Sequence, residues 1–207
     1  PFVEAETSAL RRRLAQLCGV PPHRLSLTEN VTSGCVLPLW GLPFEPGDSL
    51  LLSDAEHPGV VAACQELARR QGLTISWFSA RDCRSDAALL ESLEAALEPS
   101  TRLVVLSHLL WNSGLAMPIE AVAAQLQNQS RPPYLLVDAA QSMGQIPVKA
   151  AAKAADIYAF TGHKWACGPE GLGGVALSER VLGEASPTLI GWRSLQDESK
   201  AVFDAED

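Results

Sequence analysis

The stretch DIYAFTGHKWACGPEGLGG, residues 156–174, places a continuous apolar run directly before a polar segment and a cluster of glycines. The apolar run at 156–160 predicts a buried strand, and Lys164 follows shortly after its end. Burial of an ammonium group is costly unless the group is paired or loses its proton. Lys164 is therefore either a surface residue beside a turn or a lysine with a chemical role.

Helix and strand signals alternate along the rest of the chain. The expected strands cover residues 24–30, 49–53, 73–79, 102–110, 134–140, 156–160 and 173–178, and the expected helices cover 5–20, 59–72, 85–100 and 118–129. Apolar residues run continuously through these strands, which indicates that both faces of the sheet are covered. We therefore expect one α/β domain over residues 1–207, with a mostly parallel central sheet flanked by helices.

Composition excludes several classes of protein. The 207 residues are 47% hydrophobic and carry a net charge of −8, with an isoelectric point near 5.0. Nucleic-acid phosphates need a basic face, so this acidic balance argues against a nucleic-acid partner. No apolar run reaches the roughly 18 residues that span a bilayer, and no signal-peptide pattern opens the chain. We expect neither a membrane partner nor export.

Cysteine usage indicates a reducing compartment. Five cysteines are an odd number, and their spacing matches neither a disulfide framework nor a zinc site. We therefore expect reduced thiols, a cytoplasmic protein and no bound metal. For Cys167, which lies close after Lys164, we expect a buried and inert thiol in the glycine-rich turn.

Polar residues follow successive expected strands. In an open parallel sheet, ligands bind beyond the carboxyl ends of the strands. Each residue has an ordinary structural explanation when taken singly: Asp138 can cap a helix, and Asn112 can form a turn. Their joint placement predicts a binding site. The strand-end residues are Thr28–Gly34, Glu56, His57, Asn112, Asp138, Gln141, Thr161, His163 and Lys164.

The residue types at these strand ends indicate the kind of ligand. A helix start with hydroxyl donors at Thr32 and Ser33 suits a phosphate. A buried carboxylate suits an aromatic cationic nitrogen, and a lysine can capture an aldehyde. Pyridoxal 5′-phosphate has all three groups. A dinucleotide site is disfavoured, because no GxGxxG motif follows the first strand.

Five motifs in this order carry a family resemblance: NVTSG at 30–34, EHPGVV at 56–61, WNSG at 111–114, VDAAQSMGQIPV at 137–148 and FTGHKWACGPEGLGG at 160–174. Together they resemble pyridoxal-phosphate enzymes of the class V aminotransferase group, in the branch of cysteine desulfurases and cysteine/cystine C–S lyases. The resemblance implies the large cofactor domain of the aspartate aminotransferase-like fold, with N- and C-terminal parts of a parent protein lying outside this sequence. NVTSG departs from the commoner phosphate loop of desulfurases and matches mainly through Thr32.

The resemblance also implies roles for individual residues. Lys164 would be catalytic and bind the aldehyde as an aldimine, and His57 would stack on the ring and move protons. Asp138 would pair with the ring nitrogen, and Gln141 would hydrogen-bond the phenolic oxygen, with Asn112 near the same edge of the ring. The phosphate would be bound by Val31, Thr32, Thr161 and His163.

The activity implied by this branch is release of sulfur from cysteine or cystine, because His57 follows a glutamate where related transaminases carry a larger aromatic ring. Transamination stays open as an alternative, as does a truncated, non-catalytic dimerisation module. The resemblance further implies a homodimer with an amino-acid substrate. In that dimer, Arg193 or Ser194 of LIGWRS would reach the partner's phosphate.

Overall fold

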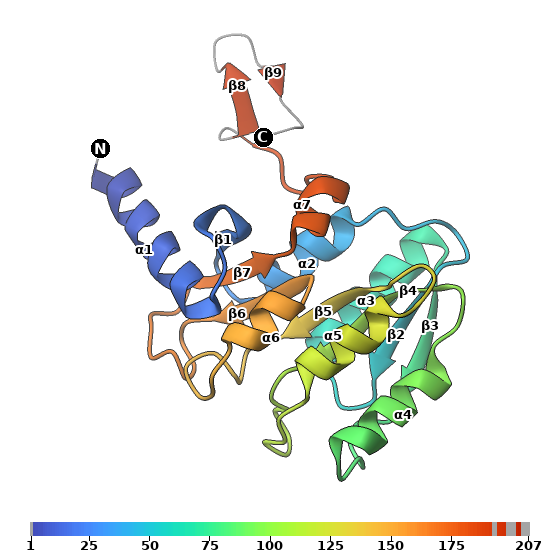
Figure 1. Cartoon of the computed structure of the whole chain (residues 1–207). Coiled ribbons are helices and arrows are strands. Elements are labelled where there is room, and N and C mark those ends of the chain that lie inside the picture. Colours follow the sequence, from blue (N-terminus) through green and yellow to red (C-terminus); the bar gives the residue numbers. More distant parts are fainter. Residues whose placement is uncertain (1, 192–193, 198–201, 204–207) are drawn as a thin grey trace.

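The computed structural model describes residues 2–191, 194–197 and 202–203. A seven-stranded sheet forms its centre, with helices on both faces, and a small two-stranded sheet stands apart near the C-terminus (Figure 1). The strands of the large sheet are β1 (Leu25–Thr28), β2 (Ser49–Ser53), β3 (Thr74–Phe78), β4 (Thr101–Ser107), β5 (Tyr134–Asp138), β6 (Ile157–Thr161) and β7 (Gly173–Leu177). The small sheet pairs β8 (Leu195–Asp197) with β9 (Val202–Phe203).

The helices fill the connections between strands. They are α1 (Phe2–Cys18), α2 (Val31–Gly41), α3 (Pro58–Gln71), α4 (Asp86–Ala96), α5 (Ile119–Gln127), α6 (Lys149–Ala154) and α7 (Glu179–Glu184), with a short 3₁₀ helix at Pro22–Arg24. Capping residues mark several ends. Ser85 caps α4 through the Ala88 amide, and Gly72 ends α3 in the left-handed conformation. The sequence pattern did not predict α6 or α7, because helices of 6 residues are too short to show a helical period.

Strand order confirms the mostly parallel sheet and adds one reversal. The order is β1-β7-β6-β5-β4-β2-β3. Neighbouring strands from β6 to β3 pair in parallel, whereas β7 pairs antiparallel with both β6 and β1. β7 therefore runs against all the other strands of the large sheet. The carboxyl ends of β1, β2, β4, β5 and β6 consequently meet at one edge, where the amino end of β7 also lies.

Alternate residues of the central strands face opposite helix layers. In β2, Leu51 packs into one apolar cluster, and Leu50 and Leu52 pack into the other. Helices α1, α4, α5 and α6 contribute to the Leu51 cluster, and α2, α3 and α7 contribute to the second. The central strands β2, β4, β5 and β6 are therefore buried at nearly every position, whereas the edge strands β1 and β3 are partly exposed. In the described part of the chain, no helix has the length and apolar character that crossing a membrane requires.

Candidate functional site

A cavity that is open to solvent lies at the carboxyl edge of the sheet. It collects residues from the ends of β1, β2, β4, β5 and β6, as expected for an open α/β sheet. The structure brings six of the predicted site residues to this cavity: Val31, Thr32, His57, Asp138, Gln141 and Lys164. The other three, Asn112, Thr161 and His163, do not line it.

Asp138 ends β5 and is 6% exposed. Its Oδ1 accepts a hydrogen bond from the Ala140 amide at 2.8 Å, and no described residue donates to its other carboxylate oxygen. Burial raises the pKa of the Asp138 carboxyl, while the Ala140 amide and the charges of Lys164 and His57 offset part of that rise. A cationic group in the cavity would therefore meet a buried carboxylate with an unused acceptor.

Lys164 lies in the loop of residues 162–172, between β6 and β7. The loop closes on itself, because the Gly162 amide bonds to the Leu172 carbonyl and the Gly168 amide bonds to the Gly162 carbonyl, each at 2.8 Å. Lys164 is half-buried, and its amine has no hydrogen-bond or ion-pair partner among the described residues. A tightly closed loop thus places the Lys164 amine, which has no hydrogen-bond partner in the described part of the chain, at a cavity that Asp138 also lines.

The start of α2 forms another wall of the cavity. Asn30 caps the helix, with its side-chain oxygen accepting from the Ser33 amide at 3.0 Å. The first-turn amides of Val31 and Thr32 have no acceptor within the helix, and a helix start carries partial positive charge. At Gly34, a Cβ would lie 3.0 Å from the Cβ of Ala159, so glycine allows α2 to sit directly on β6. This helix start can bind an anion.

The predicted residues outside the cavity lining lie on neighbouring segments. Thr161 is buried at the end of β6, and its hydroxyl is 2.9 Å from Nδ1 of the exposed His163. Asn112 is exposed in the turn that follows β4. Ser194 bonds to Gly191 within a surface turn, and Arg193 lies outside the described residues. The roles predicted for these residues stay predictions.

His57 is held by the start of α3. Its Nδ1 accepts a hydrogen bond from the Gly59 amide at 3.1 Å, so the neutral ring carries its proton on Nε2. Proton exchange at this ring can therefore use Nε2 without losing the helix cap. Trp111 contacts the imidazole edge-on, with ring centroids 5.8 Å apart and planes at 72°. Sequence reasoning missed Trp111, although it belongs to the WNSG motif.

A buried carboxylate joins two of the strand ends. Glu56 accepts hydrogen bonds from the Ser107 amide at 2.9 Å, from the Ser107 hydroxyl at 2.7 Å and from the Ser53 hydroxyl. Burial is the largest cause of its raised pKa, these hydrogen bonds oppose the rise, and the nearby charge of Asp138 adds to it. Glu56 ties the end of β2 to the end of β4. Ser107 lines the cavity, and the strand-end rule could have identified it.

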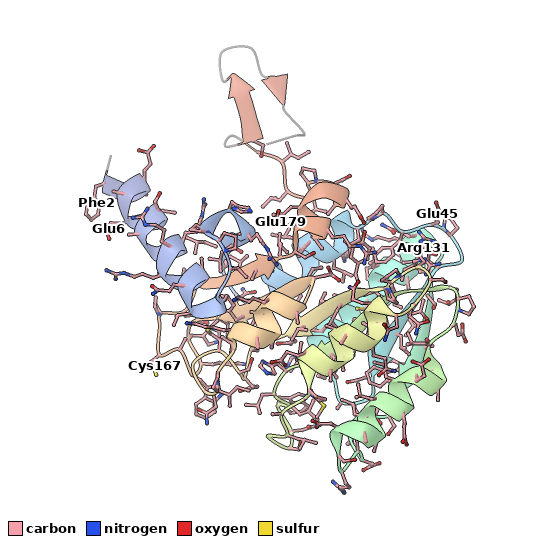
Figure 2. The ribbon with its side chains drawn as sticks, in the orientation of Figure 1. Phe2, Glu6, Glu45, Arg131, Cys167 and Glu179 are labelled. Atoms are coloured by element: carbon pink, nitrogen blue, oxygen red, sulfur yellow. The ribbon has the colours of Figure 1, made fainter. Side chains whose placement is uncertain are left out.

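Cys167 corrects one expectation. The residue is exposed rather than buried, as Figure 2 shows on the loop that follows β6. Its φ of 53° lies in the left-handed region, and its amide bonds to the Lys164 carbonyl at 3.1 Å. This left-handed turn within the loop of residues 162–172 directs Cys167 to the surface. All five cysteines are free.

The Lys164 loop is braced against the segment after β5 at Gly144. A Cβ at Gly144 would lie 2.3 Å from the Trp165 carbonyl oxygen, and the φ of Gly144 is +90°. We expect Gly144→Ala to destabilise the fold by roughly 2–4 kcal/mol, the sum of left-handed strain and a backbone clash. Gly47→Ala is the matched control, because Gly47 has φ +94° and open space around the added Cβ. Urea unfolding of both variants measures the difference, and equal losses would mean that the contact is unimportant.

Comparisons with known proteins come from sequence and from structure. The family model described as Aminotransferase class-V matches residues 3–202. The isopenicillin N epimerase of Streptomyces clavuligerus is 35% identical over 92% of this chain and 49% of its own length. The cysteine desulfurase of Haloferax volcanii is 30% identical over 86% of this chain and 42% of its own length.

A solved structure matches more of the chain. The cystine C–S lyase C-DES, in complex with its reaction product cysteine persulfide, superposes with a TM-score of 0.91 and 40% identity. The match covers 99% of this chain and 54% of that protein. Another structure of C-DES, a mutant, has glycine covalently linked to its PLP cofactor. This chain thus spans about half the length of the relatives it matches.

Proposed function

Because the chain belongs to the class V aminotransferase family, we propose that it binds pyridoxal 5′-phosphate in the cavity at the carboxyl edge of the sheet. We further propose that the protein releases sulfur from cysteine or cystine, as a C–S lyase or a desulfurase. The single observation that carries the proposal is the cavity itself, in which an unpartnered Lys164 amine and the buried Asp138 carboxylate meet the start of α2.

The residues of the cavity fit the three chemical groups of this cofactor. Asp138 has an unused carboxylate oxygen for a protonated ring nitrogen, and its burial would strengthen that ion pair. The amides of Val31 and Thr32 at the helix start suit the phosphate. Lys164 supplies the amine that an aldehyde requires. His57 and Gln141 line the same cavity and would cover the ring and bind its phenolic oxygen.

The chain's own residues then have definable tasks in sulfur release. When bound, pyridoxal phosphate provides an electron sink for the α-carbon of an amino acid. Nζ of Lys164 would take the proton from that carbon, and Asp138 would hold the proton on the ring nitrogen. The electron pair of the C–H bond forms a carbon–carbon double bond, and the bond from the β-carbon to sulfur breaks. Sulfur leaves as sulfide from cysteine or as a persulfide from cystine, and the remaining enamine hydrolyses to pyruvate and ammonia.

Two observations favour sulfur chemistry. The C–S lyase structure shares 40% of its residues with this chain across nearly the whole chain. Moreover, a histidine rather than a larger aromatic ring occupies the position next to Glu56 in the cavity wall, as the sequence resemblance requires. A desulfurase would instead yield alanine and would need a nucleophilic cysteine from elsewhere in the protein.

A second candidate is epimerisation at the α-carbon, which the 35% identity with an isopenicillin N epimerase favours. An epimerase would also remove the α-proton, but it would return a proton to the opposite face and leave the β-substituent in place. Two further alternatives are transamination, which needs a keto acid as second substrate, and a non-catalytic cofactor-fold module. These possibilities predict different products from the same starting amino acid.

We expect the full-length protein, supplied with pyridoxal phosphate and then with cystine or cysteine, to form pyruvate and either sulfide or persulfide. The assay measures pyruvate, alanine and sulfide separately, together with deuterium incorporation at the α-carbon in heavy water. Alanine in place of pyruvate would identify a desulfurase. Racemisation without sulfur release would favour the epimerase, and conversion that depends on a keto acid would favour a transaminase.

We propose that this chain is the cofactor-binding domain of a cytoplasmic homodimer with a small amino-acid substrate. Exposed apolar residues support a protein partner, because Leu189 and Ile190 are 71% and 55% exposed in this structure. The acidic composition is consistent with a protein that binds neither nucleic acid nor membrane. Sedimentation velocity of the full-length protein measures the oligomeric state.

A further inference from the structure

We propose that Trp165 is a positioning residue that fixes the orientation of the Gln141 side-chain amide, so that the amide NH₂ group faces the cavity. The inference rests on the proposed function, because that NH₂ group would donate to the phenolic oxygen of pyridoxal phosphate. Trp165 would act only through Gln141.

A hydrogen bond between the two side chains is the first observation. Nε1 of Trp165 donates to Oε1 of Gln141 at 2.8 Å, across 24 positions of the sequence. An indole N–H is a donor and cannot accept. A side-chain amide has an oxygen and a nitrogen of similar size, and its hydrogen-bond partners decide which one points where. This bond therefore assigns the oxygen of Gln141 to the tryptophan side.

The positions of the two residues give the second observation. Gln141 lines the cavity together with Lys164 and Asp138. Trp165 does not line that cavity, and it lies instead in a separate surface groove with Met143 and Gly144. The indole thus reaches Gln141 from outside the cavity, and the backbone of Trp165 is braced there by its contact with Gly144. Trp165 is therefore placed to act on a molecule in the cavity through Gln141.

The unused end of the amide is the third observation. No described residue accepts a hydrogen bond from Nε2 of Gln141, so both of its N–H donors remain available to a bound molecule. A phenolic oxygen that carries negative charge needs a donor, and a carbonyl oxygen in the same place would repel it. Without the indole, both amide orientations become accessible, and one of them opposes binding.

A double-mutant cycle on the full-length protein tests the inference, using Trp165→Phe, Gln141→Ala and the double variant. Trp165→Phe removes the N–H and keeps an aromatic ring. We expect it to raise the Kd for pyridoxal phosphate roughly three- to tenfold, the range for loss of one hydrogen bond. We also expect the pH midpoint of the bound cofactor's visible absorbance to rise by roughly half a unit to one unit, since the anionic phenolic oxygen loses its donor.

The cycle separates positioning from a general structural effect. If Trp165 acts through Gln141, then Trp165→Phe will change neither the Kd nor the pH midpoint in the Gln141→Ala background. Trp77→Phe is the matched control, because Trp77 is 47% exposed on β3 and Trp165 is 51% exposed. We expect Trp77→Phe to leave both quantities at their wild-type values.

Two results would overturn the inference while leaving the proposed function intact. One is a wild-type Kd and pH midpoint in Trp165→Phe, and the other is an undiminished effect of Trp165→Phe in the Gln141→Ala background. A wild-type protein that fails to bind pyridoxal phosphate would be a different failure. It would overturn the proposed function itself, and this inference with it.

Discussion

Lys164→Ala is expected to abolish covalent capture of pyridoxal phosphate and to leave the fold intact. The amine that reacts with the aldehyde is lost, and alanine has no replacement nucleophile. Lys164 has no hydrogen-bond or ion-pair partner among the described residues and is only half-buried, so its removal leaves no unsatisfied buried group. We expect the stability change to stay within about 1 kcal/mol. Sulfur release by the full-length protein should fall by a factor of at least roughly 10³.

Borohydride reduction followed by peptide mapping checks this prediction. In wild type, the reduced cofactor should be attached to the peptide that contains Lys164. The chain offers Lys153, exposed on α6, as a matched control, and Lys153→Ala should label like wild type. Lys164→Arg keeps the positive charge near Asp138 but cannot capture the aldehyde. Reducible cofactor on Lys164→Ala at the wild-type level would mean that another lysine is the reactive one.

Asp138→Asn is expected to have opposite effects on cofactor binding and on the stability of the cofactor-free protein. The proposed ion pair with the ring nitrogen would be lost, and breaking a buried pair of this kind costs about 3 kcal/mol or more, roughly a hundredfold in Kd. Without the cofactor, however, the charged carboxylate destabilises the folded protein. Burial raises its pKa, which means that the folded protein disfavours its charged form.

The sign of the pH dependence follows from this raised pKa. Between the ordinary aspartate value of about 3.9 and the higher folded value, the folded protein holds a proton that the unfolded chain has released. The unfolding free energy of wild type therefore falls as pH rises through that window. An asparagine does not titrate. Asp138→Asn should thus be more stable than wild type above the window and nearly equal to it below about pH 4.

Thermal unfolding across pH measures this difference. Each unit by which the pKa is raised corresponds to about 1.4 kcal/mol, or roughly 3–6 °C in Tm for a chain of this size. Asp156→Asn is a control that we expect to lower the Tm. Both oxygens of Asp156 accept hydrogen bonds, from the Leu135 amide and the Ser178 hydroxyl, and an asparagine there would remove the negative charge that strengthens these bonds. A Tm difference for Asp138→Asn that does not depend on pH would contradict the assigned protonation.

The candidate site was predictable from sequence to the extent that it depends on strand ends. Parallel strands deliver their carboxyl ends to one edge, so a polar residue after each apolar run is brought near the others by topology alone. This rule correctly gathered Asp138, Gln141 and Lys164 around one cavity. The rule was less accurate for residues whose loops turn away from the cavity. Asn112 lies in an exposed turn beyond β4, and no local pattern shows which way such a turn faces.

The reversed direction of β7 could also have been predicted from the sequence. A parallel connection needs a crossover of a dozen or more residues, usually with a helix, to return to the starting edge. The loop at 162–172 has no helical pattern and returns directly as β7. The glycine that begins β7 fits the close approach of β7 to β6, because a Cβ at Gly173 would lie 2.6 Å from the Phe160 carbonyl oxygen.

The amino-acid sequence by itself determined the alternation of helices and strands, the burial of both sheet faces and the edge at which the site lies. Each of these depends on periodicity or on topology, which are properties of short segments in order. Only the tertiary structure decided the partners of individual side chains: Trp165 with Gln141, Trp111 with His57, and Glu56 with Ser107. Glu56 and Ser107 are 51 positions apart. A hydrogen bond needs its two atoms within about 3 Å, so such pairs depend on the exact course of several loops rather than on any local pattern.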